Sequence, residues 1–134
     1  MKYIAKIIFY LINFFDVFLK KIFNKKFLFF LKDLIENKSY TEKEISNKKI
    51  FFFTPNSITK WRVDTLFSKE PETINWIDSF DDRENFIFWD IGANIGLYSI
   101  YAASKFKNIF VVSFEPSTSN VRVLSRNISI NNLQ

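Results

Sequence analysis

The chain has 134 residues, which is long enough for one domain, and it carries a formal net charge of +5. It contains neither cysteine nor histidine, which excludes disulfides, thiolate-bound or histidine-bound metals, and any mechanism that requires a histidine base. Residues 1–49 hold 11 lysines and 5 acidic residues, whereas residues 50–134 hold 8 basic and 9 acidic residues. Nucleic acid is therefore not a predicted partner, because a basic binding face should include the folded part.

The first 36 residues have the pattern of an amphipathic basic helix. At about 100° per residue, the polar side chains fall on one stripe roughly 80° wide, and nearly everything else up to Leu19 is large and apolar. The polar interruptions argue against a transmembrane span, and no small-residue cleavage site follows that would indicate a secretory signal. The stripe consists of Lys2, Lys6, Asn13, Asp16, Lys20 and Asn24.

Two interpretations of this helix remain open. Either it lies in a membrane interface with its lysines on lipid phosphates, or it packs against the rest of the protein or a second copy. The absence of cysteine fits a reducing compartment. We expect a cytoplasmic protein, for which the first interpretation adds peripheral membrane contact through residues 1–36. Residues 1–47 are predicted to form this arm and a polar linker, 38–47, separate from residues 48–134.

The middle of the chain is predicted to begin with a hairpin over residues 49–63. Two β-rich runs, Ile50–Thr54 and Ile58–Val63, flank the turn-forming triplet Pro55-Asn56-Ser57. A helix is predicted over residues 70–80, because proline and acidic residues occupy its first turn. Residues 81–85 are predicted to form the turn that follows.

The last fifty residues alternate between strand and helix patterns. Strands are predicted at Phe86–Ile91 and Ile109–Phe114, and helices at Ile95–Phe106 and Thr118–Asn131. This βαβα order is the opening of a Rossmann-like, doubly wound parallel sheet, so the predicted fold class is α/β with its core in residues 86–134.

The only two glycines, Gly92 and Gly96, stand where the first of these strands turns into its helix. The dinucleotide fingerprint does not fit, since Leu97 occupies the place of its last glycine. An acidic residue two positions before the first glycine, here Asp90, is instead the pattern of S-adenosylmethionine sites. Glu115 ends the second strand, where a carboxylate can accept hydrogen bonds from a ribose diol. Asp90 taken alone could equally be a strand-end carboxylate that caps the next helix.

The string Phe88-Trp-Asp-Ile-Gly-Ala-Asn-Ile-Gly-Leu-Tyr-Ser99, followed by Phe114-Glu-Pro-Ser117, resembles the FkbM family of S-adenosylmethionine-dependent methyltransferases. The upstream segments Trp61-Arg62 and Glu70-Pro-Glu-Thr73 are similar to those that lead into the core of such proteins. The resemblance covers residues 50–134 and leaves the arm out.

The resemblance implies that the loop after the first strand binds the methionine part of the cofactor S-adenosyl-L-methionine. Asp90 would orient the amino group, and Gly92 and Ala93 would offer backbone groups. Asn94 would bond the carboxylate, and Gly96 would let the helix start close to the cofactor.

The resemblance also implies roles after the second strand. Glu115 would bind the ribose hydroxyls and Pro116 would lie near the adenine. We interpret Asn120 and Asn127 as helix-surface or turn-capping residues. Pro116 has the alternative of simple strand termination.

The reaction that the resemblance implies is methyl transfer to an acceptor, usually oxygen, on a glycan or a small molecule. No residue is assigned as the general base. Because a complete domain of this type needs further βα units, we expect the chain to be the N-terminal part of a methyltransferase and inactive by itself. Two alternatives remain: a non-catalytic membrane-associated module, and an NAD-type oxidoreductase, which the missing third glycine disfavours.

Overall fold

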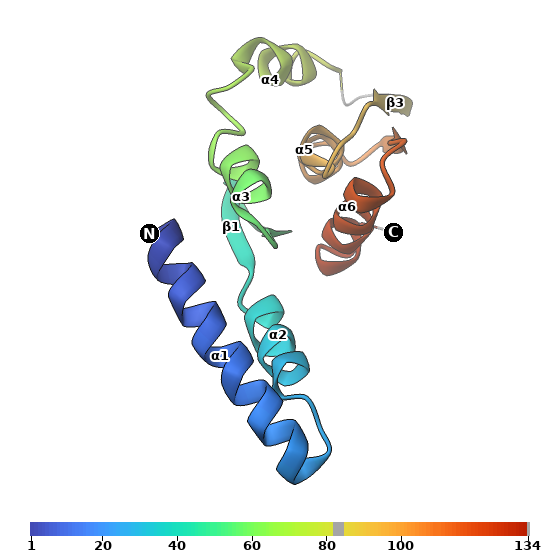
Figure 1. Ribbon diagram of the computed structural model, residues 1–134. Helices are drawn as coiled ribbons and strands as arrows, with labels where there is room; N and C mark the ends of the chain where they lie inside the picture. Colours follow the sequence, from blue (N-terminus) through green and yellow to red (C-terminus); the bar gives the residue numbers. More distant parts are fainter. Residues whose placement is uncertain (82–84, 134) are drawn as a thin grey trace. The chain divides into compact units, whose positions relative to one another are not determined.

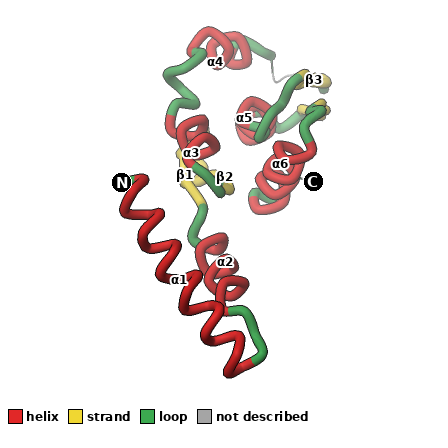
Figure 2. Tube along the Cα trace, viewed as in Figure 1, coloured by secondary structure: helices red, strands yellow, loops and turns green. Residues whose placement is uncertain are grey.

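The computed structural model describes residues 1–81 and 85–133. They form two compact units, Met1–Lys38 and Ser39–Gln134. Six helices and two small sheets make up the described part of the chain, which gives an α/β fold. Figure 2 shows how short the strands are relative to the helices.

The first unit is a pair of helices, not the single helix that the sequence pattern predicts. Helix α1 spans Lys2–Phe23 and helix α2 spans Phe27–Asn37, and they lie side by side (Figure 1). Asn24 ends α1 in the left-handed conformation, with φ 53°, which asparagine tolerates better than most residues. None of the helices in the described part of the chain combines the length and apolarity that crossing a bilayer requires.

The second unit begins with a hairpin that lies earlier in the chain than predicted. Strand β1, Tyr40–Ile45, pairs with strand β2, Lys48–Phe53, in antiparallel register. The two turn residues, Ser46 and Asn47, both have positive φ, 51° and 58°, as two-residue hairpin turns of the primed type require. The predicted linker over 38–47 is therefore wrong, since most of it is the first strand.

The predicted hairpin over 49–63 is wrong in its second half. Residues Ser57–Asp64 form helix α3, because the Asn56 side chain accepts hydrogen bonds from the N–H groups of Ile58 and Thr59 at 3.0 and 2.9 Å. Thr59 reciprocates by accepting from the Asn56 N–H at 3.2 Å, which completes a capping box. The buried side chains Thr59 and Val63 are four residues apart, which is helical spacing.

The remaining elements follow the predicted order. Helix α4, Pro71–Asp78, precedes the unit β3–α5–β4–α6, and residues 82–84 of the predicted turn lie outside the described residues. The bounds are β3 Phe86–Ile91, α5 Leu97–Lys105, β4 Ile109–Phe114 and α6 Thr118–Ile130. Strands β3 and β4 are parallel, and Ile91 pairs with Phe114, so both strands end at the same edge.

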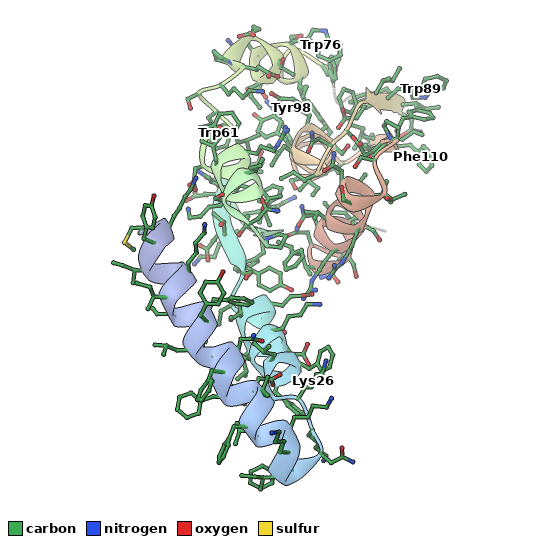
Figure 3. The ribbon with its side chains drawn as sticks, in the orientation of Figure 1. Lys26, Trp61, Trp76, Trp89, Tyr98 and Phe110 are labelled. Atoms are coloured by element: carbon green, nitrogen blue, oxygen red, sulfur yellow. The ribbon has the colours of Figure 1, made fainter. Side chains whose placement is uncertain are left out.

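One hydrophobic core lies inside the second unit, between the hairpin, the β3–β4 sheet and helices α3 to α6. Phe52, Phe53 and Val63 are almost completely buried in it. The other face of the β3–β4 sheet is exposed, and Figure 3 shows Trp89 and Phe110 projecting from it. The core thus holds the loop at the ends of β3 and β4 against helices that come from upstream in the chain.

Candidate functional site

The loop between β3 and α5 is held against the end of β4 by backbone hydrogen bonds. The N–H groups of Gly92 and Ala93 both donate to the carbonyl oxygen of Phe114, at 2.8 and 2.9 Å. The Gly96 N–H donates to the carbonyl of Ala93 at 2.7 Å. The resemblance implies that Gly92 and Ala93 offer backbone groups to a ligand, but their amides are already bonded within the fold.

The two glycines have different local roles, although both have positive φ, 85° and 84°. A Cβ at Gly92 would have no atom within 4 Å, so this residue leaves open space above the loop. A Cβ at Gly96 would lie 2.3 Å from Cδ1 of Leu124 on α6. The structure therefore gives Gly96 a packing role between α5 and α6, in addition to the implied approach to a cofactor.

Asp90 is buried and bonded to the first turn of α5. Its Oδ2 accepts hydrogen bonds from the Ser99 N–H, at 3.0 Å, and from the Ser99 hydroxyl. The Ser99 Oγ lies 2.7 Å from the Oγ of Ser113, which is paired with Asp90 across the sheet. Asp90 thus bonds an N–H in the first turn of the next helix, as its interpretation as a strand-end carboxylate predicts.

Glu115 connects the end of β4 to the loop. Its Oε2 accepts from the Asn94 N–H at 2.8 Å, and its Oε1 accepts from the Ser117 N–H at 2.8 Å and the Asn120 amide at 3.3 Å. The Ser117 bond, followed by the Asn94 and Asn120 bonds and the charge of Arg62, holds the pKa of Glu115 below its ordinary value. Glu115 is therefore ionised at neutral pH.

A pocket of about 240 Å³ lies over this loop. Its wall is formed by Gly92 and Asn94 of the loop, by Arg62 of α3, and by Lys69 and Glu70, which precede α4. Tyr98 of α5 completes the wall and reaches toward the start of α4 (Figure 3). The pocket is thus lined by charges of both signs, at the edge where the two parallel strands end.

Glu70 and Tyr98 form a hydrogen-bonded pair in this wall. The Tyr98 hydroxyl donates to Glu70 Oε2 at 2.7 Å, while the Lys69 ammonium donates to Oε1 at 2.6 Å. The Lys69 bond, and then the Tyr98 bond, lower the pKa of Glu70. Burial and the neighbouring Glu70 carboxylate raise the pKa of Tyr98, so at neutral pH the tyrosine keeps its proton.

Reasoning from the sequence did not place Arg62, Glu70 or Tyr98 in a site. The available signal was the resemblance of Trp61-Arg62, Glu70–Thr73 and the string ending at Ser99 to segments of one family. It indicated that these segments belong together, and the fold shows that Arg62, Glu70 and Tyr98 line the same pocket.

Asn127 is not the helix-surface or turn-capping residue that we expected. It is completely buried, accepts from the Phe53 N–H at 2.6 Å and donates to the Ile95 carbonyl at 2.8 Å. It therefore joins β2 to the loop after β3 through α6. Pro116 is exposed beside Glu115, so the structure brings the candidate residues of both strand ends to one edge, with Asp90 beneath them.

Comparison with known proteins gives one partial relationship. The chain is 45% identical over 42 residues to "Methyltransferase sdnD" of Sordaria araneosa, and the match covers 31% of this chain and 16% of that protein. No family model and no solved structure matches. The match spans about a sixth of the length of this curated relative, and it relates the chain to a methyltransferase.

Proposed function

We propose that residues 39–134 belong to an S-adenosyl-L-methionine-dependent methyltransferase of the FkbM type. The observation that carries this proposal is the hydrogen bond between Glu115 and the Asn94 amide. It places an ionised carboxylate from the end of β4 beside a glycine loop from the end of β3, at the edge of the sheet where nucleotide cofactors bind. The partial identity to a methyltransferase supports the same reaction class.

The residues around the pocket fit the charged groups of this cofactor. Gly92 leaves the space over the loop that a side chain would fill. Glu115, which accepts from the N–H of Asn94 in the pocket wall, would accept hydrogen bonds from the ribose diol. Arg62 would bind the methionine carboxylate by charge-assisted hydrogen bonds. Glu70 would attract the methionine ammonium group. Asp90 would act by holding α5 in place, since its carboxylate accepts hydrogen bonds from both the N–H and the hydroxyl of Ser99.

The same geometry disfavours a dinucleotide. Pyrophosphate binding in such loops uses backbone N–H groups that point at the ligand. Here the amides of Gly92 and Ala93 donate to Phe114, and the Asn94 amide donates to Glu115. The loop therefore has little to offer a pyrophosphate, while the adjacent carboxylates suit a ligand with a diol and an ammonium group.

When bound, S-adenosylmethionine would supply a methyl group on a positively charged sulfur. An acceptor hydroxyl oxygen would bond to that methyl carbon as the carbon–sulfur bond breaks, with the hydroxyl proton going to a base or water and the sulfur leaving as a neutral thioether. The chain's own residues would contribute binding and orientation, which carry much of the catalysis when the electrophile is already activated. The proposed acceptor is an oxygen of a glycan or a small molecule, by resemblance.

We further propose that the β3–β4 pair belongs to a larger Rossmann-like sheet. Doubly wound sheets carry helices on both faces, whereas one face of this pair exposes Ile87, Trp89 and Phe110. The pocket of about 240 Å³ is also smaller than ordinary cofactor sites of roughly 300 Å³ or more. We therefore expect weak cofactor binding and no detectable methyl transfer by the 134 residues alone.

Ligand-observed NMR on the chain tests the proposal. Saturation transfer should reach S-adenosylhomocysteine and not NAD⁺ at equal concentrations. Glu115→Gln should weaken S-adenosylhomocysteine binding roughly tenfold to hundredfold, since hydrogen bonds to a charged acceptor are lost. Glu44→Gln removes the same charge from an exposed position on β1 and should leave binding unchanged. Equal binding of NAD⁺, or an unaffected Glu115→Gln variant, would contradict the assignment.

A further inference from the structure

The helical unit, residues 1–38, has no apolar core of its own. Asp16 is the only buried residue of α1, and α2 has none. Oδ1 of Asp16 accepts from the Leu28 N–H at 2.8 Å, so this carboxylate satisfies the start of α2, which lacks a side-chain cap of its own. A unit whose buried residue is a carboxylate gains little from the hydrophobic effect by itself.

The apolar side chains of α1 are instead exposed along its whole length. All of its large apolar side chains except Ile12 and Leu19 are between 50% and 83% exposed, with Tyr3 and Phe14 at 83% and 73%. Soluble proteins rarely leave a continuous apolar surface of this extent uncovered. We therefore expect this apolar surface of α1 to be covered by a binding partner.

The packing of α2 leaves most of the apolar side of α1 free. Ile12, Asp16 and Leu19, spaced four and three residues apart, are the side chains of α1 that are buried or half-buried. They lie at the edge of the polar stripe, because Asp16 belongs to it. At about 100° per residue, an arc roughly 120° wide, bounded by Phe14 and Ile8, holds only apolar residues and lies outside this contact. Figure 3 shows side chains projecting from α1 on the side away from α2.

The charged residues of this unit indicate the chemistry of the partner. Residues 1–38 hold eight lysines and three acidic residues, and one of the three, Asp16, is buried. Four lysines are gathered where α1 turns into α2: Lys20, Lys21, Lys25 and Lys26. A second copy of this surface would carry the same positive charge and repel it. A bilayer surface with anionic headgroups offers both an apolar layer and negative phosphates.

We propose that residues 1–38 bind the surface of an anionic lipid bilayer. The apolar arc of α1 enters the boundary between headgroups and acyl chains, and the lysines at the helix turn contact lipid phosphates. Asp16, buried against the start of α2, is removed from this surface, which keeps a negative charge away from the lipid. The proposal is independent of the methyltransferase assignment, because it rests on the first unit alone.

Flotation of the full chain with vesicles tests the proposal. The chain is synthesised in a cell-free system with vesicles of phosphatidylcholine and phosphatidylglycerol at 70:30, or of phosphatidylcholine alone, about equal in lipid concentration. The expected result is co-flotation with the anionic vesicles and release as salt is raised, because screening weakens the lysine contacts. Equal flotation with both vesicle types at every salt concentration would overturn the proposed role of anionic lipid.

Three pairs of substitutions, one of them a control, separate the contributions of charge and apolar surface. Lys25→Gln with Lys26→Gln should weaken binding to anionic vesicles about 30-fold, from about 1 kcal/mol per lysine near the surface. As the control, Lys49→Gln with Lys60→Gln removes two exposed lysines from the second unit. This pair should not change binding to anionic vesicles. Phe14→Ser with Phe18→Ser should weaken binding to both vesicle types. A chain that forms dimers in light scattering and does not float would overturn the proposal in favour of a second copy.

Discussion

Gly96 and Leu124 pack so closely that a Cβ at position 96 would lie 2.3 Å from Cδ1 of the leucine. This contact brings the first turn of α5 against α6, and α6 also carries the buried Asn127. The position of the loop after β3 is thus set by packing beneath it, while the space above Gly92 stays open.

The two glycines should therefore respond differently to alanine. Both substitutions incur the strain of positive φ, about 1–2 kcal/mol. Gly96→Ala should cost about 1–3 kcal/mol more, because the added methyl group overpacks against Leu124. Urea denaturation of the two variants measures the difference. Adding Leu124→Val removes the clashing methyl group. It should restore part of the free energy of unfolding that Gly96→Ala loses and none of that which Gly92→Ala loses.

Equal destabilisation by the two alanine substitutions would show that packing against Leu124 does not constrain position 96. Gly92→Val provides a second readout, because its side chain would occupy the space above the loop. It should impair S-adenosylhomocysteine binding more than its effect on folding explains.

Asn127 should be among the most sensitive polar residues of the second unit. Asn127→Ala leaves the Phe53 N–H and the Ile95 carbonyl buried without their partner, which should lower the free energy of unfolding by about 2–4 kcal/mol. Asn75→Ala, at an exposed position on α4, is the matched control and should stay within about 0.5 kcal/mol of the unsubstituted chain. Thermal and urea unfolding both report the difference. A loss below about 1 kcal/mol would mean that the interior rearranges to satisfy both backbone groups.

The pKa of Glu70 should depend on Tyr98. In the folded chain, hydrogen bonds from Lys69 and then Tyr98 lower this pKa below the ordinary value of 4.5. A carboxylate whose pKa is depressed by folding stabilises the fold above its unfolded pKa, and this contribution is lost as the pH falls through the folded pKa. Tyr98→Phe should raise the pKa of Glu70 and reduce the acid-dependent loss of stability below about pH 4.5.

NMR titration of the glutamate carboxyl carbons measures this change directly. Tyr101→Phe is the matched control, since the Tyr101 hydroxyl donates to Asp78 at 2.7 Å and not to Glu70. It should shift the titration of Asp78 and leave Glu70 unchanged. An unaltered Glu70 titration in Tyr98→Phe would show that Lys69 alone determines the shift.

Local patterns along the chain were sufficient to predict the β3–α5–β4–α6 order and the two strands with their bounds. The apolar runs Phe86–Ile91 and Ile109–Phe114 are short and end at a glycine or an acidic residue. These signals act within a few residues, so no distant contact is needed to interpret them. The candidate loop from Asp90 to Gly96 and its neighbour Glu115 could be located for the same reason.

The hairpin and the arm show where local patterns were ambiguous. Residues 58–63 alternate like a strand, but the Asn56 cap and the burial of Thr59 and Val63 make them helical. Neither Ser46 nor Asn47 is a glycine, yet both adopt positive φ because a two-residue turn in this hairpin register requires it. Propensity is a weak prior that packing overrides.

The sequence by itself determined where a strand turns sharply into a helix and which carboxylate follows the next strand, because backbone sterics and periodicity are local. Only the tertiary structure decided that Arg62, Glu70 and Tyr98 share a pocket with that loop. It also decided that Asp90 caps α5, that Asn127 joins β2 to Ile95, and that α2 leaves the apolar arc of α1 exposed. These are contacts between residues far apart in the chain, and their free energy depends on distances and burial that only the complete fold sets.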